Sequence, residues 1–159
     1  MAYFANSHLY RSLLLLLLLS VALNDVYAFT FGKLFGKRKL CPNTSPNKTV
    51  AGAVGALVGT TLTVTLLGLL VLPGAQEMRW PHLVFAGIML SVCGQLGDLM
   101  LSAIKRDVGL KDTGTLLPGH GGLLDRADSL LLAAPAAFHF VGFFEGVGLN
   151  MPTRILTGG

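Results

Sequence analysis

The sequence has 159 residues, the length of a single domain, but its composition is far from that of a soluble domain. Hydrophobic residues make up 52% and charged residues only 13%, whereas charged residues are about a quarter of a typical soluble protein. The net charge is +4, yet the charges are bunched between long apolar runs, which excludes a disordered chain and a nucleic-acid-binding arm. The composition therefore indicates a protein whose first partner is the lipid bilayer.

Four apolar segments follow one another along the chain, and each is long enough to cross a bilayer. Roughly 20 apolar residues, rising about 1.5 Å each, cover the roughly 30 Å hydrocarbon layer. We therefore predict an all-α, polytopic membrane protein that forms a single transmembrane domain. Its four helices are expected at about residues 12–31, 50–72, 83–104 and 129–149.

The first segment also fits a second interpretation. Arg11, the leucine run that follows it and the small residues up to Ala28 are typical of a secretory signal with a cleavage site. Against this, the chain continues past Asn24 and Asp25 directly into another apolar stretch. The sequence favours a retained first span and leaves cleavage open.

Lys and Arg alternate between the segments in a way that predicts topology. One lies before the first span, five in the first loop, one in the second loop, four in the third loop and one in the tail. Because loops rich in Lys and Arg face the cytoplasm, the first and third loops are predicted to be cytoplasmic and both chain ends to face outward.

Two further patterns concern helix packing and helix starts. Ala51, Gly55 and Gly59 recur at a spacing of four, which predicts a stripe of small residues where another helix approaches closely. Ser45 followed by Pro46 is typical of a helix start, with Ser as the N-cap and Pro at the first helical position. We therefore expect the second helix to begin there.

The third loop carries an ordered set of glycines and charged residues. Gly119, Gly121 and Gly122 surround His120, and such a segment lets backbone N–H groups form a concavity that binds anions. The basic side chains that would neutralise a polyphosphate are Lys105, Arg106, Lys111 and Arg126. The alternative is a solvated loop whose basic residues only fix the topology, and the loop alone does not decide between them.

Asp98 is the only charged residue in the third segment, and its position argues for a function. An ionisable side chain near the centre of a bilayer costs at least about 2.5 kcal/mol and is retained mostly where it has a partner or a role. Spacings of three and four residues place Asp98 on one helical face with Gly94, Ser102 and Lys105. The sequence therefore predicts that Asp98 lies toward the cytoplasmic side of the bundle, near the third loop.

Asp125 begins the antiparallel helix that follows, so its carboxylate is expected to meet Asp98 at one depth in the membrane. Paired carboxylates beside a phosphate-binding loop suit Mg²⁺, which binds through one or two carboxylates and substrate phosphates. Asp25 is a further candidate residue for the same site, from the first helix. Helix capping is the alternative role for Asp125 and Asp128.

The segment from Ser102 to Asp128, SAIKRDVGLKDTGTLLPGHGGLLDRAD, resembles the signature of the phosphatidate cytidylyltransferases, or CDP-diacylglycerol synthases. A weaker similarity runs from Asn24 to Gly52. The resemblance covers nearly the whole chain from Asn24 onward, and the chain resembles the C-terminal, catalytic half of a usual member of the family.

The resemblance implies a multi-pass enzyme of the inner (cytoplasmic) membrane, with its catalytic loops in the cytoplasm. Such an enzyme joins CTP to phosphatidate, giving CDP-diacylglycerol and pyrophosphate. It implies Mg²⁺ as cofactor, with K⁺ as a second cation, and it leaves a homodimer open. The implied catalytic residues are Asp98, Asp125, Lys105, Arg106 and His120, with Asp98 and Asp125 as metal ligands. The implied substrate-binding residues are Lys48, Ser102, Lys111, Asp112, Gly119, Gly121, Gly122, Arg126 and Asp128.

Two positions depart from the family pattern, and two other functions stay open. Ala51 stands where the family usually has an acidic residue before Gly52, and Asn47 stands where a basic residue is common. One alternative is a CTP-dependent kinase of polyprenol or phytol type, which transfers the γ-phosphoryl group. The other is a non-catalytic membrane subunit derived from the family.

Overall fold

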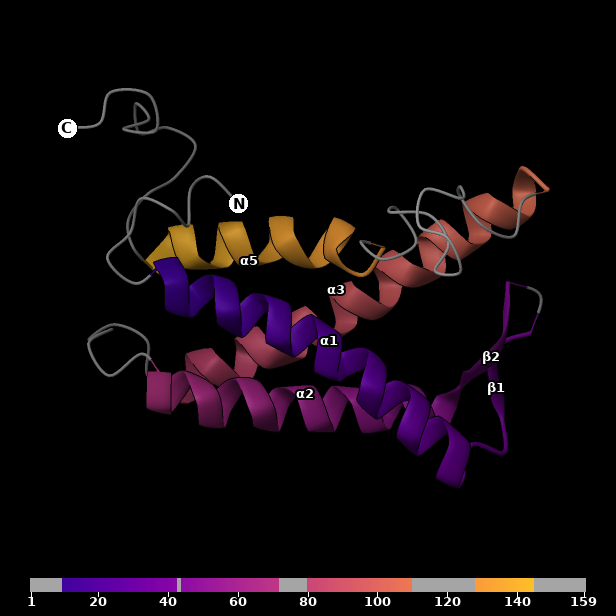
Figure 1. Ribbon diagram of the computed structural model, residues 1–159, viewed down its shortest axis with the longest axis horizontal. Helices are drawn as coiled ribbons and strands as arrows, with labels where there is room; N and C mark the ends of the chain where they lie inside the picture. The colour runs from indigo at the N-terminus through magenta and orange to yellow at the C-terminus, as the bar shows by residue number, and fades with distance from the viewer. Residues whose placement is uncertain (1–9, 43, 72–79, 110–127, 145–159) are drawn as a thin grey trace.

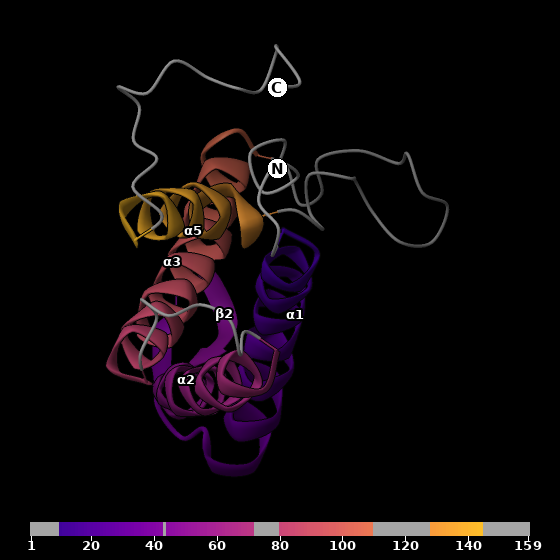
Figure 2. The same ribbon diagram turned by 90° about the vertical axis from the view of Figure 1, so that its left-hand side faces the viewer.

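A computed structural model describes residues 10–42, 44–71, 80–109 and 128–144. These residues form four helices, α1 (Tyr10–Phe35), α2 (Val50–Val71), α3 (Trp80–Asp107) and α5 (Leu130–Phe144), and a hairpin of two short strands, β1 (Lys39–Cys41) and β2 (Ser45–Thr49). Figure 1 shows α2 and α5 on opposite sides of the molecule with α1 and α3 between them, and the hairpin at one end. The turned view in Figure 2 also shows α5 toward the top of the molecule and α2 toward the bottom.

Three of the helices are long and apolar enough to cross a membrane: Ser12–Phe35, Val50–Leu70 and Trp80–Asp107. The described part of α5 has 15 residues and is about 22 Å long at about 1.5 Å per residue, so by itself it is shorter than a span. The end of the predicted fourth span, at residues 145–149, lies outside the described residues. The prediction of an all-α polytopic membrane protein is confirmed.

Helices α1 and α3 are longer than the spans predicted for them, and α1 is continuous through the position considered as a cleavage site. It runs from Tyr10 through Ala28 to Phe35, and α3 extends three residues beyond each end of the predicted 83–104. The described stretch from Leu13 to Val21 packs into the core with parts of α2, α3 and α5. The first segment therefore takes part in the fold along its described length.

Each helix buries a narrow stripe and turns other apolar side chains outward. On α2, Ala56, Thr60 and Val64 are fully buried at a spacing of four residues. The opposite face of α2 is apolar as well, with Val58 and Leu62 more than half exposed. A helix that is hydrophobic on every side is typical of a membrane span, where lipid rather than water covers the outer face.

Close helix approach at the predicted small-residue stripe is confirmed, and the structure shows that the approaching helix is α1. A side chain added at Gly55 or Gly59 would clash with an aromatic ring of α1. The closest backbone approach is at Gly52, where a Cβ atom would lie 2.5 Å from the carbonyl oxygen of Ala28. The absence of a side chain at Gly52 therefore allows α1 and α2 to approach closely beside the hairpin.

The predicted helix start at Ser45 and Pro46 is wrong, because both residues belong to strand β2. The helix begins at Val50, and Thr49 is its cap, since the Thr49 hydroxyl accepts a hydrogen bond of 3.1 Å from the backbone N–H of Gly52. Pro46 is tolerated in β2 because a two-stranded hairpin has only edge strands. The hairpin thus delivers the chain, including Lys48, to the start of α2.

Candidate functional site

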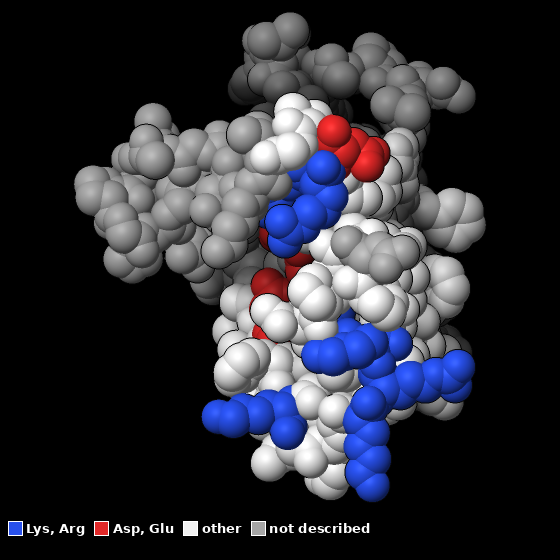
Figure 3. Space-filling view, turned by 90° about the vertical axis from the view of Figure 1, so that its right-hand side faces the viewer, with Lys and Arg blue, Asp and Glu red and all other residues white. Residues whose placement is uncertain are grey.

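A pocket of about 260 Å³ lies where the hairpin meets α1, α2 and α3. Its wall includes the charged side chains of Asp25, Lys48 and Asp98, together with the ring of Phe29 and the amide of Gln95. Figure 3 shows acidic side chains recessed in this face of the molecule, between two groups of Lys and Arg. The pocket therefore combines apolar lining residues with a few polar and charged side chains, as binding sites for small molecules usually do.

Asp98 and Lys48 form the central contact of the site. The Lys48 Nζ lies 2.5 Å from Asp98 Oδ2, and both side chains are about one quarter exposed. The other oxygen, Oδ1, accepts a hydrogen bond of 3.3 Å from the Ser102 hydroxyl, one helical turn further along α3. The predicted shared face of α3 is thus confirmed for Asp98 and Ser102, and the fold adds Lys48 from a distant strand.

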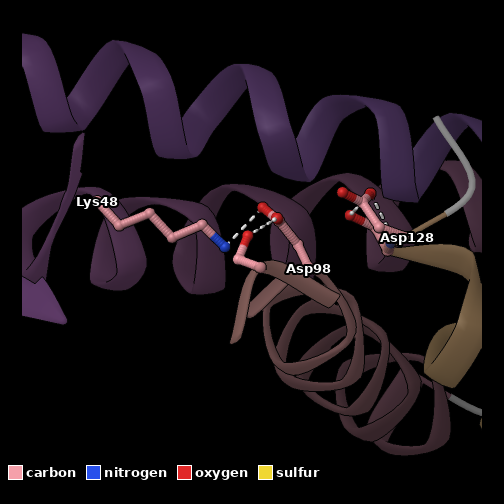
Figure 4. A network of polar contacts seen from close by, with 5 residues as sticks. Lys48, Asp98 and Asp128 are labelled. Atoms are coloured by element: carbon pink, nitrogen blue, oxygen red, sulfur yellow. Dashed lines mark hydrogen bonds and ion pairs between the residues drawn. The ribbon is translucent and has the colours of Figure 1, made fainter. Parts of the chain in front are cut away.

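Asp128 approaches Asp98 from the side opposite Lys48 (Figure 4). Its Oδ1 accepts hydrogen bonds from the backbone N–H of Ser129, at 2.7 Å, and from the Ser129 hydroxyl, at 3.3 Å. Burial and the nearby Asp98 carboxylate raise the pKa of Asp128 above its ordinary value, and the bonds from Ser129 partly offset this effect. Asp128 therefore satisfies a backbone donor before α5 and also faces the site.

Asp25 adds a third carboxylate from α1. It interacts electrostatically with Asp98, Asp128 and Lys48, which places it in the same cluster. Three carboxylates, from α1, from α3 and from the residue before Ser129 and α5, therefore lie in one cluster, and Lys48 pairs with the central one, Asp98. This acidic cluster (Asp25, Asp98 and Asp128) carries more negative charge than Lys48 alone offsets.

Asn24, the neighbour of Asp25, fixes the position of α1 relative to the other helices. It is 1% exposed, and its Oδ1 accepts hydrogen bonds from Thr60 of α2 at 3.1 Å and from Ser91 of α3 at 2.6 Å. Its Nδ2 makes no hydrogen bond with any described residue. Because this amide joins three helices one residue away from Asp25, it holds that carboxylate at the level of the cluster.

Sequence reasoning did not assign this role to Asn24, although a signal was present. A polar amide inside a leucine-rich helix is costly in lipid and usually has partners on neighbouring helices. Gln95 belongs to the same network, because its Nε2 donates to the Ser91 hydroxyl at 3.0 Å and to the carbonyl of Ala53 at 3.3 Å. The network lies next to the pocket, whose wall includes Gln95.

The other predicted site residues fall into two groups. Lys105 and Arg106 lie in the last turn of α3, about two turns beyond Asp98, where cations favour the negative end of the helix dipole. The remaining predicted residues lie outside the described residues: Lys111, Asp112, Gly119, His120, Gly121, Gly122, Asp125 and Arg126. The predicted meeting of Asp98 with Asp125 therefore stays a prediction, and the described partner of Asp98 on that side is Asp128.

The donor chemistry of the acidic cluster fits a hard divalent cation, which prefers carboxylate oxygens. Within the described ranges, no group of three or more His, Cys, Asp or Glu side chains is arranged to enclose a metal ion. Mg²⁺ does not require such a cage, because it usually binds one or two carboxylates and completes its shell with water and substrate phosphates. Asp98 lies at the centre of the cluster, and its Oδ2 is paired with the Lys48 ammonium group.

Comparison with known proteins gives a family for this arrangement. The sequence model described as "Cytidylyltransferase family" matches residues 2–144, which is most of the chain. The chain is also 45% identical over 121 residues to the phosphatidate cytidylyltransferase of Bacillus subtilis (strain 168). The aligned region covers 76% of this chain and 44% of the relative.

Two other relatives give the same picture. The phosphatidate cytidylyltransferase of Staphylococcus saprophyticus is 48% identical over 117 residues, covering 74% of this chain and 44% of the relative. The Escherichia coli protein named "Uncharacterized protein YnbB" is 42% identical over 131 residues, covering 82% of this chain and 43% of the relative. The chain thus spans less than half the length of the curated relatives it matches. With a family match over residues 2–144 and these identities, the chain belongs to the cytidylyltransferase family.

Proposed function

We propose that this protein transfers the cytidylyl group of CTP to phosphatidate, giving CDP-diacylglycerol and pyrophosphate for phospholipid synthesis. The observation that carries the proposal is the Lys48–Asp98 pair, set in the acidic cluster beside a pocket among membrane-spanning helices. The names of the Bacillus and Staphylococcus relatives support the same reaction. A site of this kind offers carboxylates for a cation and ammonium groups for phosphates.

In the proposed reaction, a phosphate oxygen of phosphatidate attacks the α-phosphorus of CTP. A new P–O bond forms to the lipid phosphate, the bond between the α-phosphorus and the bridging oxygen breaks, and pyrophosphate leaves with the electron pair. Mg²⁺, when bound, would supply charge neutralisation on the transferring group. Asp98 and Asp125 are the proposed ligands that hold it.

The protein's own part in this chemistry is to bind and orient charged groups. Lys48 lines the pocket and is placed to contact a phosphate there, while Ser102 orients the Asp98 carboxylate through its hydrogen bond. Lys105 and Arg106, at the end of α3, are proposed to neutralise the leaving pyrophosphate. Phosphoryl-transfer chemistry of this type depends mainly on such positioning and electrostatic stabilisation.

The site is proposed to face the cytoplasm, where CTP is made, in the inner membrane of a bacterium. The high Lys and Arg count of the first and third loops supports this orientation. Alkaline phosphatase fused after Arg79 should then be active outside the membrane, and the same enzyme fused after Lys39 should be inactive. Activity of the Lys39 fusion with loss of the Arg79 fusion would reverse the proposed topology.

The reaction can be tested with CTP labelled at two phosphates. We expect label from [α-³²P]CTP to enter lipid in the presence of Mg²⁺ and phosphatidate, and label from [γ-³²P]CTP to be released as pyrophosphate. The products are separated by thin-layer chromatography after extraction into chloroform.

The alternative functions predict different products in the same assay. A CTP-dependent lipid kinase would place the γ label in the lipid and leave CDP, which would overturn the proposal. If neither label entered lipid, even with the N-terminal half of a longer relative supplied in trans, a non-catalytic membrane subunit would be the better description.

A further inference from the structure

We propose that Lys48 is an internal counter-ion that competes with a divalent cation for Asp98 and moves to an anionic ligand in the pocket when the cation binds. The inference rests on the proposed function, because it needs a cation at Asp98 and a phosphate-bearing ligand next to it. It adds that the two are coupled through one side chain. Cation and anion would then bind cooperatively.

The first step of the argument is that both oxygens of Asp98 are engaged. Oδ2 pairs with the Lys48 ammonium at 2.5 Å, and Oδ1 accepts the hydrogen bond from Ser102. A cation that binds Oδ2 takes the position of the ammonium group, because two positive charges repel each other strongly at contact distance in a partly buried site. The neutral Ser102 hydroxyl experiences no such repulsion, so Lys48 is the group that must leave.

The second step is that Lys48 can move without disturbing the fold. Its neighbour Thr49 is 7% exposed and caps α2 through the Gly52 N–H, so the backbone of the hairpin is anchored at this point. The ammonium stands at the end of a flexible four-carbon stem, which carries a charge readily from one partner to another. Figure 4 shows this stem extended from the strand toward Asp98.

The third step is that the pocket is the natural destination. Lys48 lines it together with the polar side chains of Ser45 and Asn47, which come from the same strand. Without a cation, Lys48 offsets part of the negative charge of the acidic cluster. When a divalent cation neutralises this charge, the ion pair with Asp98 no longer stabilises the ammonium group, which is then available for a phosphate group.

The movement can be measured on the purified full chain in detergent, without CTP or lipid, by amine acetylation read out by mass spectrometry. Mg²⁺ should increase the labelling rate of Lys48 by about fivefold or more, and inorganic phosphate added with Mg²⁺ should lower it again. Lys39, an exposed lysine on the same hairpin, is the internal control and should be labelled at a constant rate.

Cation affinity gives a second, independent measurement, with Mn²⁺ as the probe and free Mn²⁺ followed by electron paramagnetic resonance. The Lys48→Met variant should bind Mn²⁺ about fivefold or more tightly than the unsubstituted chain, because the competitor is gone. Lys48→Arg, which keeps the charge, should bind it as weakly as the unsubstituted chain. Lys39→Met should leave the affinity unchanged.

The outcomes separate the inference from the proposed function. If Mn²⁺ binds the unsubstituted chain but Lys48→Met binds it no more tightly and Mg²⁺ leaves Lys48 labelling unchanged, the counter-ion role is overturned while the proposed function stands. If no variant binds Mn²⁺, the cation site fails and the inference fails with it.

Discussion

Replacing Asp98 by asparagine should lower the transfer of α label from CTP into lipid by about 100-fold or more. The substitution keeps the volume of the side chain and removes the charge that pairs with Lys48 at 2.5 Å. An amide oxygen is a much weaker partner for Mg²⁺ than a carboxylate, so charge on the transferring phosphoryl group would be left unbalanced. The measurement is the initial rate of lipid labelling at saturating Mg²⁺, with the amount of inserted protein held equal.

A matched control is available on the same helix. Asp107, the last residue of α3, is exposed, and Asp107→Asn removes the same charge away from the pocket, so it should keep most of the activity. A purely structural ion pair makes a different prediction, because the double variant Asp98→Asn with Lys48→Met would then recover the activity. Recovery in the double variant would show that Asp98 is only the partner of Lys48.

Much of the fold follows from sequence patterns that act over short distances. Long apolar runs predicted the membrane-spanning helices, because the surface that such a helix exposes to lipid must be hydrophobic. The contact between Ser102 and Asp98 followed from a spacing of four residues, since side chains one turn apart on a helix lie next to each other. Such features need no knowledge of how the helices are packed.

The remaining features depend on contacts between distant residues, which a single sequence does not encode locally. Lys48 meets Asp98, which lies 50 positions further along the chain, because the hairpin turns the chain back over the pocket, and nothing near Lys48 predicts that turn. The Ser45–Pro46 pair is typical of a helix start, but this pattern takes no account of strand pairing with residues elsewhere in the chain. Because β2 pairs with β1, Ser45 and Pro46 are part of a strand, and Thr49 caps α2 instead.

The packing of α3 against the start of α5 gives a second prediction with a large effect. Gly97 is buried, and a Cβ atom added to it would lie 2.6 Å from the carbonyl oxygen of Asp128, closer than real Cβ contacts allow. Gly97→Ala should therefore push the Asp128 segment away from Asp98. We expect the free energy of unfolding to fall by about 1–3 kcal/mol, as in other overpacked cores, and lipid labelling to fall as well.

Gly94, one turn earlier on the same buried face, is the matched control. A Cβ atom there would lie 3.6 Å from Asn24 Nδ2 and 3.9 Å from the Cβ of Ser129, which are ordinary contacts. Alanine stabilises a helix relative to glycine by up to about 1 kcal/mol. The melting temperature of Gly94→Ala should therefore equal or exceed that of the unsubstituted chain. Thermal unfolding of both variants in detergent, followed by circular dichroism, gives the comparison. Equal melting temperatures for Gly97→Ala and Gly94→Ala would contradict the close contact between α3 and Asp128, and with it the placement of Asp128 in the acidic cluster.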